Sequence, residues 1–338
     1  MDFASDNWSG ATPAVEQAVL RANAGSAPAY GDDELTAQVA RTFCEVFERD
    51  VDVLFVTSGT AANLLCLQAV SRPSGFVLCG DEAHILADEY NGPEFFTGMK
   101  LVPVATSAAR MTPQTLRGAI AALLPPDQRG PLAALSLTNA TESGTTYTAA
   151  ETAELAALAK EAGAKVHLDG ARFANAVAAT GDSPADLTWR AGVDLMSFGG
   201  TKNGCWAAEA VVVFDPGAYP DLSNLRQRSG HGLSKQRFIA AQYDGYFADG
   251  TWLATAAHAN AMAARLAAGL QATEAARLEW ATTSNELFPV LSSAAVARLR
   301  EAGAQFHTWR EHGEEEMIRL VTSYATTEDE VDALLAML

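Results

Sequence analysis

Short apolar segments alternate with helix-length segments along most of this chain, and this alternation constrains the fold more than any other feature. The apolar segments are residues 51–56, 76–78, 101–104, 132–137, 165–168, 193–198 and 210–214. Helix signals lie between several of them; Thr148-Ala-Ala-Glu151, for example, is a capping box that opens a helix ending at Gly163. Strands that are joined by helices pair in parallel, and helices then cover both faces of the sheet. The sequence therefore predicts an α/β protein with a mostly parallel sheet.

Further signals extend this prediction to both ends of the chain. Helices are expected from Thr12-Pro13 to Gly25, from Asp32-Asp33 to Glu48, from Ala61 to Val70 and from Thr112-Pro113 to Pro125-Pro126. A long Ala-rich helix, Leu253–Ala276, precedes strands at 286–291, 305–309 and 317–323, a helix ending at Gly303, and a capping box at Thr327 and Glu330. We therefore expect an N-terminal arm at the active site (1–15), a large domain (16–250) and a small C-terminal α+β domain with its linking helix (251–338).

One lysine occupies an unusual position. The apolar strand Val193–Phe198 runs into the glycine-rich turn Gly199–Gly204, which contains Lys202. Burial lowers the pKa of such an amine and frees its lone pair, so Lys202 is a candidate Schiff-base residue. Taken alone, the segment also fits a lysine in a surface loop.

Two other polar groups follow apolar strands, at the sheet edge where open α/β folds bind ligands. Ser58-Gly59-Thr60 opens a helix, and its hydroxyls and N–H groups form a candidate phosphate cradle, although the same residues also serve as a simple helix cap. Asp169 ends a strand, where a buried carboxylate needs a cationic partner. That partner is either Arg172 or the protonated ring nitrogen of a cofactor.

A histidine and an arginine complete the set of candidates. His84 also follows a strand, where its flat ring is placed to stack on a planar cofactor or to move a proton; a helix-capping or core histidine is the alternative. Arg319 lies within the apolar strand Met317–Val321, and its guanidinium matches a carboxylate with two parallel bonds unless the strand is an edge and Arg319 points to water. The other histidines show no metal-ligand spacing.

Together these residues fit one ligand. A phosphate at Ser58–Thr60, a ring stacked on His84, a pyridine nitrogen at Asp169 and an aldehyde carbon at Lys202 describe pyridoxal 5'-phosphate (PLP). The composition agrees with a small-molecule enzyme, because a net charge of −18 argues against nucleic acid and anionic membranes as partners. Four cysteines without paired spacing indicate reduced thiols in the cytoplasm.

The chain resembles the low-specificity L-threonine aldolases, a family of fold type I PLP enzymes in the β-eliminating lyase group. The resemblance runs from about residue 3 to 245. It rests on Phe3-Ala-Ser-Asp-Asn7, Tyr30-Gly-Asp-Asp33, Gly59-Thr-Ala-Ala-Asn63, Pro93-Glu-Phe-Phe96, Thr141-Glu-Ser-Gly-Thr145, His167-Leu-Asp-Gly-Ala-Arg-Phe173 and Ser197-Phe-Gly-Gly-Thr-Lys-Asn-Gly204, the last flanked by Glu209. In the small domain, Ile318-Arg-Leu-Val321 is the clearest match.

The resemblance implies a role for each matching residue. Lys202 would hold the cofactor covalently, Asp169 would hold its ring nitrogen and His84 would stack on its ring. Ser58, Gly59 and Thr60 would bind its phosphate. The residues that would engage the substrate carboxylate or the cofactor's phenolic oxygen are Ser5, Arg172 and Arg319. Tyr30 would reach in from a neighbouring subunit, which implies a homodimer or homotetramer with shared active sites.

The implied reaction is retro-aldol cleavage of L-threonine, L-allo-threonine and related β-hydroxy-α-amino acids, including phenylserine, to glycine and an aldehyde. Many relatives carry a second histidine near the β-hydroxyl, where this chain has Ala140. His84, a water molecule or a phosphate oxygen then remains as the base.

Three other functions are compatible with parts of the sequence. The first is another fold type I PLP enzyme, either a β-eliminating lyase or an aminotransferase, and the second is a non-catalytic relative of the fold. The third, a serine hydrolase, lacks the Gly-x-Ser-x-Gly elbow. The sequence does not specify the aldehyde side chain, the threo/erythro preference, or a dimer over a tetramer.

Overall fold

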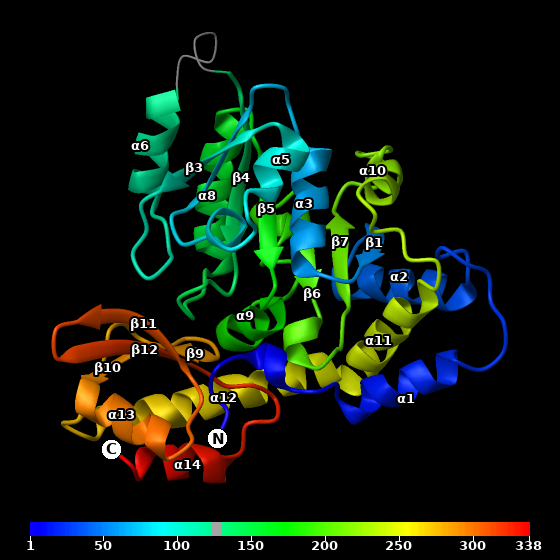
Figure 1. Cartoon of the computed structure of the whole chain (residues 1–338). Coiled ribbons are helices and arrows are strands. Elements are labelled where there is room, and N and C mark those ends of the chain that lie inside the picture. Colours follow the sequence, from blue (N-terminus) through cyan, green and yellow to red (C-terminus); the bar gives the residue numbers. More distant parts are fainter. Residues whose placement is uncertain (124–129) are drawn as a thin grey trace.

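The computed structural model describes residues 1–123 and 130–338 and is built around a seven-stranded sheet (Figure 1). Its strands, in spatial order, are β1 (Asp52–Val56), β7 (Glu209–Val213), β6 (Leu195–Gly199), β5 (Lys165–Gly170), β4 (Leu132–Thr138), β2 (Phe76–Gly80) and β3 (Lys100–Val104). All neighbouring pairs are parallel except those of β7, which runs antiparallel to β1 and β6. The predicted mostly parallel α/β sheet is confirmed, with one reversed strand that the sequence did not reveal.

Helices cover both faces of this sheet. They are α1 (Pro13–Ala22), α2 (Glu34–Val46), α3 (Gly59–Ala69), α4 (His84–Ala87), α5 (Gly92–Thr97), α6 (Pro113–Leu123), α8 (Ala149–Glu161), α9 (Phe173–Thr180), α10 (Leu222–Arg228) and α11 (Arg237–Phe247). Side chains of α2, α6, α8, α9 and α11 join one hydrophobic cluster, and those of α3, α4 and α10 join another. Consecutive strand residues alternate between the two, as Leu195 and Met196 do, because neighbouring strand side chains point to opposite faces.

Several residues that the sequence predicts to begin helices cap those helices in the structure. Thr12 and Asp33 cap α1 and α2 through their side chains, and the capping box at Thr148 is fully formed. Pro125-Pro126, expected to end α6, lies outside the described residues.

A second sheet lies below the first in Figure 1. Its antiparallel strands follow the order β11 (His307–His312), β12 (Glu315–Val321), β10 (Pro289–Ser292) and β8 (Ala276–Leu278), with β9 (Glu286–Leu287) paired to β12. It packs with α12 (Thr251–Gln271), α13 (Ser293–Glu301) and α14 (Glu328–Leu335) around its own cluster of apolar side chains. The N-terminal segment joins this sheet, because Phe3 exchanges backbone hydrogen bonds with Gln305 and Val321.

The sequence misplaced some elements of this region. The helix expected over Leu253–Ala276 is α12, which ends at Gln271, and Ala276 instead begins β8 because it pairs with β10. The strand expected over 286–291 is divided into β9 and β10 at Phe288, and β10 begins at Pro289, which has no N–H group to continue the ladder. The strand expected at 305–309 begins later, at His307.

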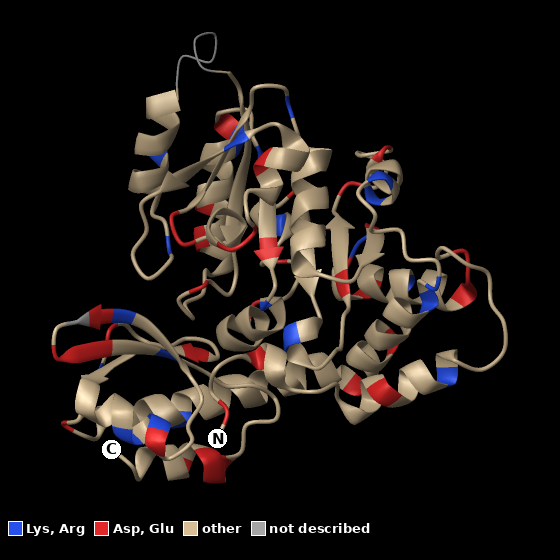
Figure 2. Cartoon of the chain, in the orientation of Figure 1, with Lys and Arg blue, Asp and Glu red and all other residues tan. Residues whose placement is uncertain are grey.

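Charged residues are spread over both sheets. Figure 2 shows acidic residues, coloured on the ribbon, in elements of both regions and interspersed with basic ones. No helix in the described part of the chain is long and apolar enough to span a membrane.

Candidate active site

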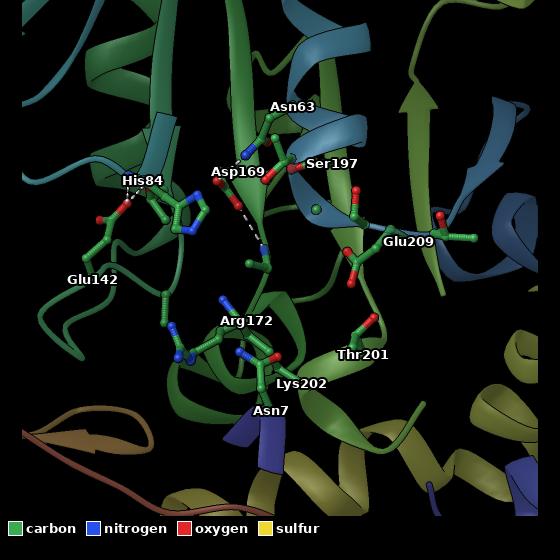
Figure 3. A pocket seen from close by; sticks show the side chains of 17 residues that line it. Asn7, Asn63, His84, Glu142, Asp169, Arg172, Ser197, Thr201, Lys202 and Glu209 are labelled. Atoms are coloured by element: carbon green, nitrogen blue, oxygen red, sulfur yellow. Dashed lines mark hydrogen bonds between the residues drawn. The ribbon is translucent and has the colours of Figure 1, made fainter. Parts of the chain in front are cut away.

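A cavity of about 280 Å³ lies where β1, β2, β4, β5 and β6 end and β7 begins (Figure 3). Its walls are formed by Asn7, Thr57, Ser58, Gly59, Thr60, Asn63, His84, Thr138, Ala140, Glu142, Asp169, Ala171, Arg172, Ser197, Thr201, Lys202 and Glu209. A second cavity adjoins it and shares Asn7, His84, Glu142, Arg172 and Lys202. It continues to Ser5, Glu286 and Arg319. The predicted site residues therefore come together here, with the exception of Tyr30.

Lys202 faces both cavities from a short turn after β6. A Cβ atom on Gly199 would lie 2.7 Å from the carbonyl oxygen of Ala171, so only glycine allows this close approach of the two segments. Asn203 anchors the turn by donating to the hydroxyl of Tyr246 and the carbonyl of Trp252. Within the described residues the amine of Lys202 makes no hydrogen bond or ion pair, so it is available to a ligand.

The turn between β1 and α3 offers N–H groups to the cavity. The hydroxyl of Ser58 accepts a hydrogen bond from the N–H of Ala61 at 3.2 Å, so the capping interpretation is correct. The N–H groups of Gly59 and Thr60 have no acceptor in the part of the chain that the structure describes. Cap and cradle are therefore compatible, because the hydroxyl satisfies one N–H group while two others stay free for an anion.

Asp169 ends β5 and is buried. Its Oδ2 accepts from the side-chain amide of Asn63 at 2.8 Å, and its Oδ1 accepts from the N–H of Ala171 at 3.0 Å. Arg172 does not pair with it, so the local ion pair that the sequence left open is wrong. Asp169 is instead a buried carboxylate that faces the cavity without a cationic partner among the described residues.

His84 begins α4 and lies on the cavity wall. Its Nδ1 is 2.8 Å from the Oε1 of Glu89, and the same oxygen accepts from Asn63. The hydrogen bond to Glu89 raises the pKa of His84. Burial raises the pKa of Glu89. His84 is therefore not a core histidine, because its ring borders the cavity and is held from behind by a carboxylate.

A cluster of four charged residues, which we call the arginine cluster, joins the N-terminal segment to both sheets. The Nε and Nη2 groups of Arg172 donate to the two carboxylate oxygens of Asp6 at 2.7 and 3.0 Å. Its Nη1 lies 3.3 Å from Glu286, and Nη1 of Arg319 lies 4.0 Å from the same carboxylate. All four side chains are largely buried.

The electrostatics of the arginine cluster follow from burial and pairing. Burial alone would raise the pKa of Asp6, but the guanidinium of Arg172 outweighs it and the pKa lies below its usual value. For Glu286 burial dominates and raises the pKa, although Arg172 and Arg319 oppose the shift. Arg319 lies on β12, which has neighbours on both sides, so the edge-strand alternative for it is wrong.

The sequence did not identify several acidic residues of the site. Glu142 follows β4 and Glu209 begins β7, and burial raises the pKa of each to about 7. Asp6 and Glu286 belong to the arginine cluster. Glu209 flanks the Lys202 motif in the sequence, but its place at the cavity depends on the reversed direction of β7, which the sequence does not indicate.

Tyr30 lies outside both cavities. Its ring is exposed, and its backbone N–H donates to the carbonyl of Ser234. It borders a separate cavity that is also lined by Thr57, Gln227 and residues 230–234. A role for Tyr30 in a neighbouring subunit stays a prediction.

The chain is similar to known proteins in both sequence and structure. The family model of the β-eliminating lyases matches residues 2–292. A low-specificity L-threonine aldolase from Pseudomonas aeruginosa is 41% identical over 309 residues, which cover 91% of this chain and 89% of the relative. A threonine aldolase structure from Leishmania major aligns with a TM-score of 0.94 at 29% identity, covering 99% of this chain and 97% of that one.

A more distant structure supports the fold alone. A serine palmitoyltransferase from S. paucimobilis, solved with bound PLP and myriocin, aligns with a TM-score of 0.73 at 17% identity. The alignment covers 100% of this chain and 86% of that one.

Proposed function

The chain belongs to the β-eliminating lyase family, among its low-specificity L-threonine aldolases, and from this membership we propose the reaction of its own cavity. That reaction is the retro-aldol cleavage of L-threonine, L-allo-threonine and related β-hydroxy-α-amino acids, including phenylserine, to glycine and an aldehyde. The observation that carries the proposal is that Lys202, Asp169 and the Ser58 turn face one cavity, which Arg172 also lines.

The residues of the cavity fit PLP. Free N–H groups at Gly59 and Thr60 suit a phosphate, the carboxylate of Asp169 suits a protonated ring nitrogen, and the unpaired amine of Lys202 suits an aldehyde carbon. When bound, PLP supplies a carbonyl that captures the substrate amine and a ring that stores the electron pair of the broken bond.

The protein's own groups then orient the substrate. Arg172 lines both cavities and Arg319 lines the second one, and a substrate carboxylate is the anion that their guanidinium groups match. Ser5 also lines the second cavity, where it adds a hydroxyl. Holding the carboxylate and the amine together fixes which bond at Cα is aligned for cleavage. His84 also lines both cavities, and we propose that it stacks on the ring.

We also propose that the active enzyme is a cytoplasmic homo-oligomer. The side chain of Tyr30 is 57% exposed and projects from its own subunit rather than into its own cavity. In a homodimer or homotetramer with shared active sites it would reach the cavity of a neighbour.

A substrate panel tests the proposed reaction. The protein is loaded with PLP and incubated separately with L-threonine, L-allo-threonine and phenylserine, and glycine and aldehyde are measured. Glycine and aldehyde in equal amounts are the expected products. Release of ammonia with a keto acid would instead identify a β-eliminating lyase, and transfer of the amino group to a keto acid would identify an aminotransferase.

A further inference from the structure

Glu142 has no part in the function proposed so far, yet it lines both cavities. It lies in the turn after β4, beside His84 at the same edge of the cavity (Figure 3). The residue is only partly exposed. Burial of an ionised group costs free energy, so a carboxylate in this position indicates a function.

One oxygen of this carboxylate is fixed by the protein and the other is not. Oε1 accepts a hydrogen bond from the backbone N–H of His84 at 2.9 Å and another from the hydroxyl of Thr138 at 2.9 Å. Oε2 accepts no hydrogen bond from another described residue. The two hydrogen bonds to Oε1 set the orientation of the carboxylate, and Oε2 is left as the oxygen that can accept a proton.

The charges around Glu142 leave it able to gain and lose a proton near neutral pH. Burial and, after it, the negative charge of Asp169 raise the pKa of Glu142 to about 7. The titratable groups that interact with it come from β2, α4, the turn before α8, β5 and the turn after β5. They are Cys79, His84, Tyr147, Asp169 and Arg172.

His84 is less suited to accept a proton from a substrate. Its Nδ1 is engaged with Glu89, and this hydrogen bond raises the pKa of the ring. A histidine with a raised pKa carries protons on both nitrogens over a wider pH range, and in that form it only donates.

We propose that Glu142 is the base that removes the β-hydroxyl proton of the substrate. The proposal rests on the retro-aldol function above. The proton of the hydroxyl group moves to Oε2 of Glu142, and the electron pair of the O–H bond becomes the second bond of the aldehyde C=O. The Cα–Cβ bond breaks at the same time, and its electron pair stays with the glycine fragment. In the synthetic direction Glu142 returns the proton to the new hydroxyl group.

The variant Glu142→Gln separates this role from a structural one. The amide oxygen of glutamine keeps both hydrogen bonds made by Oε1, whereas its NH₂ group cannot accept a proton. Two reactions of the PLP-loaded protein are compared: cleavage of phenylserine, which needs the hydroxyl proton removed, and exchange of the glycine α-proton in D₂O, which does not. The change in visible absorbance when glycine binds is measured alongside.

We expect cleavage to fall by about a hundredfold or more, while glycine exchange and the absorbance change stay within about threefold of wild type. Glu142→Asp, which keeps a carboxylate on a shorter arm, should recover part of the cleavage. The control is Glu94→Gln, which changes a partly buried carboxylate on α5 outside both cavities and should leave all three measurements unchanged.

The pH dependence gives a second test. Wild-type cleavage at low substrate should rise through about pH 7 as Glu142 loses its proton, and this limb should be absent from Glu142→Gln. Equal loss of cleavage and glycine exchange in Glu142→Gln, or cleavage at the wild-type rate, would overturn the proposal. A wild-type protein that exchanges glycine protons but cleaves no β-hydroxy amino acid would overturn the proposed function itself, so the two failures are distinguishable.

Discussion

The two ends of the combined cavity are built in different ways. At one end, Ser58, Gly59 and Thr60 come from a single strand–turn–helix unit and offer N–H and hydroxyl groups without a formal positive charge. At the other end, the arginine cluster draws Asp6, Arg172, Glu286 and Arg319 from the N-terminal segment, the large sheet and the second sheet.

This difference shows how each end is expected to respond to change. The phosphate end depends on the N-terminus of a single helix, so a substitution there should weaken phosphate binding moderately and leave the rest of the fold in place. The arginine cluster holds three segments of the chain together through buried charges, so removing one partner leaves another charge uncompensated. If the comparison is correct, substitutions at one end should change cofactor affinity, and substitutions at the other should change stability and amino-acid affinity.

Lys202 faces both ends, and its loss should have the largest effect. In Lys202→Ala we expect turnover to fall by about three orders of magnitude or more and the visible absorbance of the bound cofactor to disappear. Turnover is measured with phenylserine as substrate. Lys100→Ala removes an exposed lysine on β3 and serves as the control. Comparable turnover in the two variants would show that the ends are not connected through Lys202.

Asp6→Asn tests the arginine cluster. Asparagine has nearly the same shape but leaves Arg172 without its bidentate partner, so we expect a loss of about 3 kcal/mol in the free energy of unfolding. The KM for the amino acid should rise by about tenfold or more, because Arg172 is no longer held in place. Denaturant unfolding and steady-state kinetics measure the two effects.

The matched control for this prediction is Asp244→Asn, which breaks the exposed pair between Asp244 and Arg21. An exposed pair contributes about 1 kcal/mol or less. Equal costs for the two variants would contradict the idea that the arginine cluster joins the segments. The contribution of Asp6 should be present above its ordinary unfolded pKa and be lost as pH falls through its lowered folded pKa.

Glu209→Gln tests the phosphate end through pH. A Cβ atom on Gly59 would lie 3.8 Å from Oε2 of Glu209, so this carboxylate lies beside the proposed phosphate position. Its pKa is raised to about 7, so it is protonated below and charged above that pH. A charged carboxylate repels phosphate, and we expect PLP affinity to weaken by about tenfold between about pH 6 and pH 8 in the wild type.

The variant should bind PLP with little change over the same pH range. Equilibrium dialysis measures the affinity, and pyridoxal without phosphate is the control ligand, since its affinity should not follow the titration of Glu209. Identical pH profiles for wild type and Glu209→Gln would place the phosphate elsewhere.

Ser58→Ala should have the smallest effect. It removes the cap of α3, so the free energy of unfolding should fall by about 1 kcal/mol, and PLP affinity should fall with it. Ser292 caps α13 with the same 3.2 Å bond in the second region, and Ser292→Ala should cost similar stability without changing PLP affinity. Equal PLP affinities of the two variants would show that Ser58 does not contribute to phosphate binding.

The same contrast explains how much of the site could be predicted from the sequence. Ser58, His84, Asp169 and Lys202 lie at or shortly after the ends of β1, β2, β5 and β6, and parallel strands end at one edge, so their convergence follows from local signals. The helix caps at Thr12, Asp33 and Thr148 are local in the same way, and each of them forms in the structure at the predicted residue.

The remaining site residues depend on tertiary structure. Asp6 and Glu286 reach Arg172 only because the N-terminal segment and the second sheet pack against the first, and no local pattern encodes that contact. Glu209 depends on the reversal of β7. Glu142 lies after β4 in the motif Thr141-Glu-Ser-Gly-Thr145, which matches the family. Its raised pKa comes from burial, which exists only in the folded chain.

The central claim is that one PLP molecule links the two ends of the cavity through the amine of Lys202. Reduction of the PLP-loaded protein with borohydride fixes the cofactor to the lysine that holds it, and peptide mapping by mass spectrometry then identifies the residue. We predict a single modified peptide that contains Lys202. Modification of another lysine, or a protein that retains no cofactor after reduction, would contradict the account.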